Sequence, residues 1–447
     1  MNKNNKNNPL LLLINPKIKY NLNKFNFLPP VALGIIADLT PKNWTTLIID
    51  ENINPVDELN LQADLVGITT NTLNISRAYE ISKKYSDIGI KVILGGSHAS
   101  AFPDEAQKYA TSVVCGEVET IWKNIINDFE NDSLKNLYHS NDFQYTEINM
   151  QLFDNKYIID AFETSRGCIN NCAFCGVHVP KTRPYTRKPI GMIINELKNS
   201  KNQYFSFIDN NFYGNDDEYL ISLFESMLKH NIKKYWQTGV SVNFFKNKEL
   251  VKLSAKAGAK MLFVGFESDT ELSLKELSKK NYIDSSNIFQ EYKEIVKSCH
   301  KNNIIITGNY MIGLDSDNEQ RINERTMFFK ELKLDQCACV IVTPLPKTKL
   351  FNKYKSENRL LYTNFPEDWK KYCYSNSIVK HDTLSNEKIE QLYYEKNKLF
   401  QISGLKIFKT IFVTKSIGGF IYFYYFCKNF GKYQNSFIER LLKIFKK

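Results

Sequence analysis

Three cysteines, Cys168, Cys172 and Cys175, stand four and three residues apart in one short segment of the 447-residue chain. Three thiolates on a curled loop suit three irons of a cubane [4Fe-4S] cluster and leave the fourth iron open to a small molecule. A structural zinc site needs four ligands; no second cysteine pair stands nearby, although His178 could complete such a site. Three closely spaced thiols cannot all form disulfides. The spacing therefore favours a cluster and leaves zinc as an alternative.

Polar residues also follow several apolar runs downstream of the cysteines, at points where strands are predicted to end. In parallel barrels the chemistry gathers at the carboxyl ends of the strands, where the cysteine loop is also expected. Any single one of these groups could instead cap a helix, but their succession favours one common site. The candidates are Asp209, Asn210, Thr238, Glu267, Ser268 and Tyr310.

The elements that would position these groups lie between residues 150 and 350. Apolar runs alternate there with helical patterns, and each gap between strands leaves room for one crossover helix. Six parallel units of this kind predict an open (β/α)6 barrel, with the cysteine loop directly after its first strand. The predicted strands span residues 158–164, 203–209, 236–242, 261–267, 304–311 and 339–343.

A separate α/β domain is predicted over residues 9–140. Its continuous apolar strands alternate with helices, the clearest at 75–88, which is typical of a doubly wound, flavodoxin-like parallel sheet. Ligands of such sheets bind beyond the carboxyl ends of the strands, and glycines there let a flat ligand approach the backbone. The strands are predicted at 10–14, 46–50, 65–69, 91–94 and 112–115. The candidate ligand contacts are Thr70, Gly95, Gly96 and His98, the last of which could instead cap a helix starting near Pro103.

The C-terminal region, residues 351–447, is predicted to be mostly helical, with an aromatic centre at 365–374. Residues 401–447 hold eight lysines and Arg440 against one acid, Glu439, so most of the net charge of +11 lies there and nucleic acid is not the expected partner. Residues 417–427 are apolar or aromatic apart from two glycines, a run too short to span a membrane. We expect a cytoplasmic protein whose tail, residues 404–447, contacts the inner membrane face peripherally, or forms an ordinary helix hairpin.

The cysteine loop resembles a known one. Cys168-x-x-x-Cys172-x-Phe174-Cys175, preceded by Ser165-Arg166-Gly167, is similar to the cluster loop of radical S-adenosylmethionine enzymes. The resemblance runs from about Leu10 to about Trp369, and in detail it is to the branch with an N-terminal cobalamin-binding domain. That branch includes carbon methyltransferases acting on lipids and antibiotics, and the anaerobic porphyrin ring cyclase.

This resemblance implies a [4Fe-4S] cluster, S-adenosylmethionine and cobalamin as cofactors, and an electron donor such as flavodoxin or ferredoxin. It implies that the segment at Asp209 and Asn210 presents backbone acceptors to the methionine ammonium, and that Glu267 contacts the ribose or the amino group. Two departures stand out. No Asp-x-His-x-x-Gly motif is present to supply a histidine to cobalt, and residues 346–349 read Pro-Lys-Thr-Lys where family members usually have Pro-Gly-Thr-Pro.

The activity implied by the resemblance is reductive cleavage of S-adenosylmethionine to a 5′-deoxyadenosyl radical, followed by methylation of an unactivated carbon on a small-molecule or lipid substrate. The alternative is an enzyme of the same architecture that does not methylate, such as an oxidative cyclase. Radical thiolation of transfer RNA is disfavoured, because residues 1–150 contain only Cys115 where that class carries further cluster cysteines. A non-enzymatic zinc module is the remaining alternative.

Overall fold

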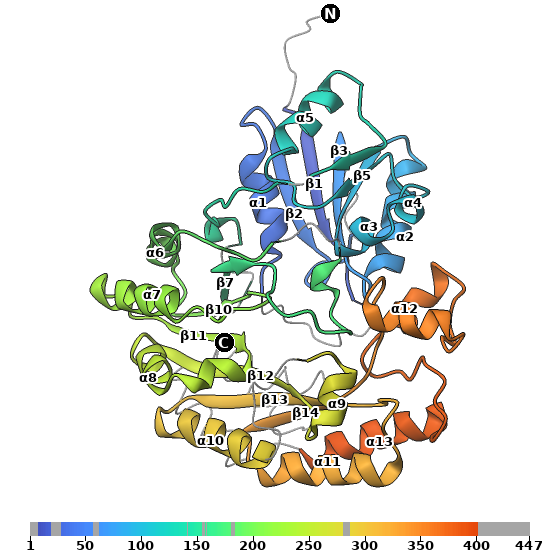
Figure 1. The fold of residues 1–447 in the computed structure, drawn as a ribbon. Coiled ribbons are helices and arrows are strands. Elements are labelled where there is room, and N and C mark those ends of the chain that lie inside the picture. Colours follow the sequence, from blue (N-terminus) through green and yellow to red (C-terminus); the bar gives the residue numbers. More distant parts are fainter. Residues whose placement is uncertain are drawn as a thin grey trace, which may run out of the picture.

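In the computed structural model the chain forms two parallel β-sheets, one above the other (Figure 1). The structure describes residues 8–18, 28–56, 62–140, 142–153, 157, 159–179, 184–279 and 287–400. The predicted membrane-contacting tail, residues 404–447, lies outside the described residues. Among those that are described, no helix is long and apolar enough to cross a membrane.

The first sheet is the predicted doubly wound sheet. Its strand order is β2-β1-β3-β4-β5-β6, and all neighbouring strands are parallel. The five predicted strands are confirmed to within two residues at each end, and β6 is an additional edge strand of three residues, too short to leave a sequence signal. The strands are β1 (Leu10–Asn15), β2 (Thr45–Asp50), β3 (Leu65–Thr70), β4 (Lys91–Gly96), β5 (Ser112–Cys115) and β6 (Leu137–His139).

Both faces of this sheet are covered, which explains the unbroken apolar runs of its strands. Leu11 and Leu13 of β1 belong to a core with residues of α1 (Val31–Leu39) and α5 (Trp122–Glu130). The alternate residues of β1 point to the opposite face, into a core with α2 (Ile75–Ser86). The carboxyl ends of these strands point toward the second sheet (Figure 1).

The second sheet is the predicted open barrel of six parallel strands, which pair in chain order. Its strands are β7 (Asp160–Phe162), β10 (Tyr204–Phe207), β11 (Tyr235–Val240), β12 (Ala259–Glu267), β13 (Ile305–Ile312) and β14 (Gln336–Ile341). Between them run α6 (Ile190–Asn199), α7 (Asp217–Lys229), α8 (Lys248–Lys256), α9 (Glu271–Glu276), α10 (Ile288–Lys301) and α11 (Glu319–Glu331). The last strand begins three residues earlier than predicted, so Cys337 and Cys339 lie within it as buried core residues.

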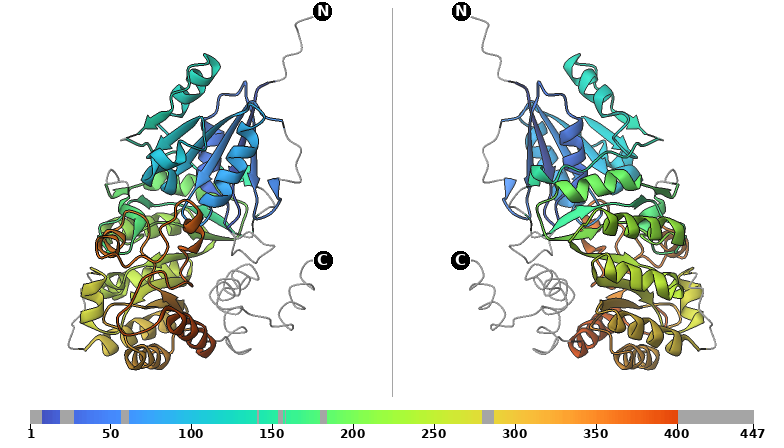
Figure 2. Two further views of the ribbon diagram at one scale, coloured as in Figure 1. Left: turned by 90° about the vertical axis from the view of Figure 1, so that its right-hand side faces the viewer. Right: turned by 90° about the vertical axis from the view of Figure 1, so that its left-hand side faces the viewer.

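The described C-terminal elements join the two sheets. They are α12 (Lys349–Ser356), the 3-10 helix η6 (Glu367–Lys371) and α13 (Asn386–Leu399). The side chains of Trp369 and Tyr372 are buried in the same core as one face of the first sheet, while α13 packs against β14 of the second. In the side views this region lies beside the second sheet and reaches the near end of the first (Figure 2). The domain boundaries at 9–140, 150–350 and 351–447 stay predictions.

Candidate active site at the cysteine loop

The cysteine loop begins directly after β7, as predicted, and a short hairpin closes its base. The strand Ser165–Arg166 pairs antiparallel with Thr186–Arg187. Between the strand and Cys168 stands Gly167, whose φ is +79°, and a Cβ there would lie 2.7 Å from the carbonyl oxygen of Pro184. Only glycine fits this left-handed, tightly packed position.

The middle of the loop is held from two sides. The Ala173 amide donates to the Leu277 carbonyl oxygen at 2.8 Å, and the Ala173 carbonyl oxygen accepts from the Leu350 amide at 2.8 Å. Leu277 follows α9 at the mouth of the barrel, and Leu350 lies in α12. The backbone between the second and third cysteines is therefore fixed before any metal binds.

Asp209, at the end of the second barrel strand, secures the beginning of the loop. Its Oδ1 accepts hydrogen bonds from the Thr164 amide at 2.9 Å, the Thr164 hydroxyl at 2.8 Å and the Ser165 hydroxyl at 2.5 Å. Burial raises the pKa of this carboxyl to about 6, although the three hydrogen bonds oppose the rise. The Oδ1 atom of Asp209 therefore forms its hydrogen bonds within the protein.

The three thiols are half-buried, and no disulfide joins any of the cysteines in the described part of the chain. Cys168 Sγ accepts hydrogen bonds from the Asn170 amide and the Asn211 side-chain amide, both at 3.4 Å. Burial raises the pKa of Cys172 to about 11 and also raises the pKa of Cys175. The irons of a cluster would supply the positive charge that stabilises thiolates at these buried positions.

The geometry disfavours zinc at this loop. Among the described residues, no three His, Cys, Asp or Glu side chains converge as ligands of one ion. His178, the fourth ligand of the zinc alternative, donates from Nε2 to the Asn170 carbonyl oxygen. A cubane cluster binds each thiolate through a different iron, so its ligands do not converge on one point, and three free thiols on one loop fit it.

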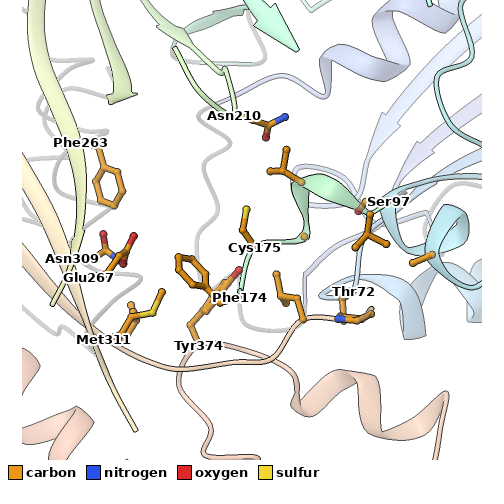
Figure 3. A pocket seen from close by; sticks show the side chains of 17 residues that line it. Thr72, Ser97, Phe174, Cys175, Asn210, Phe263, Glu267, Asn309, Met311 and Tyr374 are labelled. Atoms are coloured by element: carbon orange, nitrogen blue, oxygen red, sulfur yellow. The ribbon is translucent and has the colours of Figure 1, made fainter. Parts of the chain in front are cut away.

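A cavity of about 510 Å³ opens beside the loop, where both sheets and the C-terminal region meet (Figure 3). Glu267, Asn309 and Phe263 form one wall, and Thr72 and Ser97 of the first sheet's loops form the opposite wall. Cys175 and Phe174 lie between these walls. Further lining residues include Asn210, Met311, Val340, Leu345 and Tyr374.

The predicted residue Glu267 lies in this cavity in an unusual backbone conformation. Its φ is +66°, and the pairing of β12 with β13 shifts register between Gly265 and Glu267. Its carboxylate accepts a hydrogen bond from Asn309 Nδ2 at 2.7 Å and pairs with Lys279 Nζ at 2.9 Å. The bulge thereby turns the end of β12 so that a charged group reaches the mouth of the barrel.

Three other predicted residues of the barrel do not line this cavity. Thr238 is buried and donates to the Phe207 carbonyl oxygen at 3.0 Å, tying β11 to β10. Ser268 is wholly buried, and Tyr310 points to the outer face of β13, where its hydroxyl lies 3.0 Å from that of Thr326. Thr238 instead lines a smaller cavity of about 300 Å³ within the barrel, together with Asp209, and a ligand role for these three residues stays a prediction.

Of the residues predicted in the loops of the first sheet, Thr70 is buried and Gly95 and Gly96 are half-buried. Gly96 has a φ of +104°, and a Cβ there would lie 2.4 Å from the Thr70 carbonyl oxygen, so only glycine fits this position. Thr70 donates to the Gly95 carbonyl oxygen at 2.8 Å and accepts from the Ala99 amide at 3.0 Å. These bonds place Ser97, rather than the predicted residues, on the cavity wall.

His98 is buried and neither faces the cavity nor caps the following helix. Its Nδ1 lies 3.1 Å from the Thr72 hydroxyl, its Nε2 lies 3.4 Å from Glu105, and its ring packs edge-on against Trp369. Burial lowers its pKa, which favours the neutral ring. The residue therefore joins the first sheet to the C-terminal region.

Sequence reasoning missed Lys279, Asn309, Met311 and Phe263. Strand alternation holds a signal for the last three, because Phe263 stands four residues before the predicted Glu267, and because Asn309 and Met311 flank Tyr310 and so share the opposite face of β13. Lys279 has no such signal: it lies in an irregular segment after α9, and only the tertiary structure brings it to Glu267.

Comparison with known proteins agrees with this arrangement. Residues 162–326 match the radical SAM superfamily. The bacteriochlorophyllide d C-8(2)-methyltransferase of Chlorobaculum tepidum is 28% identical over 87% of this chain and 86% of that protein. The hopanoid C-2 methylase of Rhodopseudomonas palustris is 24% identical over 75% of this chain and 66% of that protein.

The fold has a counterpart among solved structures. The radical S-adenosylmethionine methyltransferase TsrM from Kitasatospora setae, solved with cobalamin and a [4Fe-4S] cluster, superposes with a TM-score of 0.63 at 14% identity over 78% of each chain. Residues 162–326 therefore carry a radical SAM domain, and the chain as a whole is similar to methyltransferases and shares its fold with a radical S-adenosylmethionine methyltransferase.

Proposed function

We propose that the protein is a cobalamin-dependent radical methyltransferase that transfers a methyl group to an unactivated carbon. The observation that carries the proposal is the single cavity in which the cysteine loop, the barrel strand ends and the loops of the first sheet meet. In this cavity a cluster-bound S-adenosylmethionine and a cofactor on the first sheet would both lie beside the same substrate. The methyltransferases among its relatives support the same reaction.

Cys168, Cys172 and Cys175 would hold the cluster, which when bound supplies one-electron cleavage of S-adenosylmethionine. Asn210 and Glu267 offer the polar groups nearest to that position in the cavity. The carboxylate of Glu267, ionised beside Lys279, is suited to accept hydrogen bonds from hydroxyl or ammonium groups. The apolar side chains around them exclude water from the reacting atoms.

The wall formed by Thr72, Ser97 and Ala101 is where cobalamin would lie against the first sheet. No histidine is among the described residues that line the cavity, and His98 is engaged elsewhere. This agrees with the missing Asp-x-His-x-x-Gly motif. We infer that the protein would present cobalamin without a histidine ligand to the metal.

The substrate that this cavity favours is an apolar small molecule or lipid. Its walls include Phe263, Met311, Val340, Leu345 and Tyr374, and the charged groups gather at the Glu267 side. The named substrates of two relatives, a bacteriochlorophyllide and a hopanoid, are of this chemical class. A highly charged substrate would have to bury its charges against apolar side chains.

The deciding experiment is anaerobic turnover of reconstituted protein with cobalamin, a reductant and S-adenosylmethionine, with two products quantified. We expect both 5′-deoxyadenosine and S-adenosylhomocysteine, because uncoupled turnover yields both without a substrate. The Cys175→Ala variant is the matched control and should yield neither. Deoxyadenosine alone would instead favour the cyclase-like alternative, and neither product from protein with an intact cluster would contradict the proposal.

We further propose that residues 404–447 bring the enzyme to an anionic membrane surface, as would suit a lipid substrate. The support is the excess of lysines beside aromatic residues in that segment. Full-length protein should sediment with anionic liposomes more than protein truncated after residue 403. Equal sedimentation of the two proteins would contradict the proposal.

A further inference from the structure

We propose that Lys279 is a fixed positive charge that raises the reduction potential of the cluster, and that Glu267 opposes it. The proposal rests on the cluster site proposed above and goes beyond it, because it assigns to a residue outside the cysteine loop the control of how readily the cluster accepts an electron. The net charge around an iron–sulfur cluster is one of the factors that set its potential.

The backbone delivers Lys279 to the cysteine loop. Leu277, two residues earlier, accepts the hydrogen bond from Ala173, which lies between the second and third cysteines. The ammonium group of Lys279 then donates to the Gly265 carbonyl oxygen at 2.6 Å and to Glu267 Oε1 at 2.9 Å. These bonds fix the position of the cation.

Gly265 makes room for this pair. A Cβ at that position would lie 2.5 Å from Glu267 Oε1 and 3.0 Å from Lys279 Nζ. The side chains of Lys279 and Glu267 are only 13% and 7% exposed, so water and salt screen their charges weakly. A charge held in this way acts on its neighbours far more strongly than a surface lysine does.

The two charges reach the cysteine sulfurs with opposite sign. Glu267 and Cys175 line the same cavity, and the ammonium group of Lys279 lies 2.9 Å from Glu267 Oε1, so one positive and one negative charge stand beside the cysteine loop. A cation that stabilises negative charge on these sulfurs also stabilises the extra electron of a reduced cluster. Lys279 therefore favours reduction, and Glu267 disfavours it.

The test is a redox titration of the reconstituted cluster, followed by electron paramagnetic resonance, in the absence of S-adenosylmethionine. Lys279→Met should lower the midpoint potential relative to wild type, and Glu267→Gln should raise it. The double variant should lie between the two single variants. Opposite shifts from two residues in direct contact are an electrostatic signature that loss of packing does not produce.

Two controls complete the design. Lys275→Met removes an exposed lysine of α9, 70% exposed and paired with Glu271, and should leave the potential unchanged. Lys279→Arg keeps the charge and should stay nearer to wild type than Lys279→Met. If Lys279→Met does not assemble a cluster, the Glu267→Gln titration still decides the question.

The inference is overturned if the Glu267→Gln and Lys279→Met potentials equal that of wild type or shift in the same direction. It fails separately from the proposed function. Wild-type protein that binds no iron would refute the cluster site, whereas a normal cluster with unchanged potentials in both variants would refute only the role of these two charges.

Discussion

At the scale of single residues, the predicted groups divide into those that border the cavity and those that bond within the chain. Glu267 and Cys175 border the cavity. Asp209 and His98 could also bind a ligand by residue type, but both form hydrogen bonds within the protein. Residue type therefore named the chemistry available at each strand end, and the tertiary contacts of each side chain decided whether that chemistry borders the cavity.

Replacing one cluster cysteine tests the ligand assignment directly. Cys175→Ala should reduce iron and sulfide in anaerobically reconstituted protein to a small fraction of the wild-type content, because one iron loses its thiolate. Cys299→Ala, a buried thiol on α10, is the matched control and should keep its cluster. Full iron content in Cys175→Ala would contradict the assignment.

Asp209 should leave a signature in the pH dependence of stability. Its pKa is raised from 3.8 to about 6, so the folded state binds a proton that the unfolded state has released. Stability from this group is therefore full below about pH 4 and is lost as pH rises to about 6, by about 3 kcal/mol. Asp209→Asn cannot ionise and should lack this loss. Urea unfolding of both proteins from pH 4 to 7 measures it, and parallel stability curves would refute it.

At the scale of elements, strand alternation decides which side chains of β13 meet the cavity. Asn309 and Tyr310 are adjacent in sequence, yet Asn309 contacts Glu267 while Tyr310 stacks on Phe329 beneath the outer helices. The strand itself was predictable from the sequence, but which of its faces meets the cavity depends on the register of the sheet. A tyrosine hydroxyl carries no indication of which side it will face.

Substitutions of Asn309 and Tyr310 should separate an effect on catalysis from an effect on stability. Asn309→Ala removes a hydrogen bond to Glu267 and should slow cleavage of S-adenosylmethionine with little effect on unfolding. Tyr310→Phe loses the contact with Thr326 and should cost about 1 kcal/mol of stability while leaving the cleavage rate unchanged. Deoxyadenosine yield and urea denaturation measure the two effects, and the reverse pattern would contradict the assigned faces.

At the scale of the whole molecule, one arginine joins the two sheets beside the cysteine loop. Arg166 donates to Glu163, which follows β7, at 2.7 Å. It also donates to Glu119, which lies between β5 and α5 of the first sheet, at 2.5 Å. Glu117 lies farther away, at 3.4 Å, and the guanidinium also lies over the Phe143 ring.

Removing this arginine should loosen the joint between the sheets. Arg166→Met leaves the buried Glu119 and Glu163 without their cation and should cost about 3–5 kcal/mol of unfolding free energy. Glu117→Gln, at the longer distance and 20% exposed, should cost less than about 1 kcal/mol. Denaturant unfolding compares the two, and equal losses would argue against Arg166 as the joint.

The sequence by itself determined the cysteine loop, both parallel sheets and the strand ends where the polar groups gather, because apolar periodicity and metal-ligand spacing are local properties. Only the tertiary structure decided that Lys279 meets Glu267, that His98 is buried under Trp369, and that Asn309 rather than Tyr310 faces the cavity. Those outcomes depend on strand register and on contacts between residues far apart in the chain, and no local pattern records either of them.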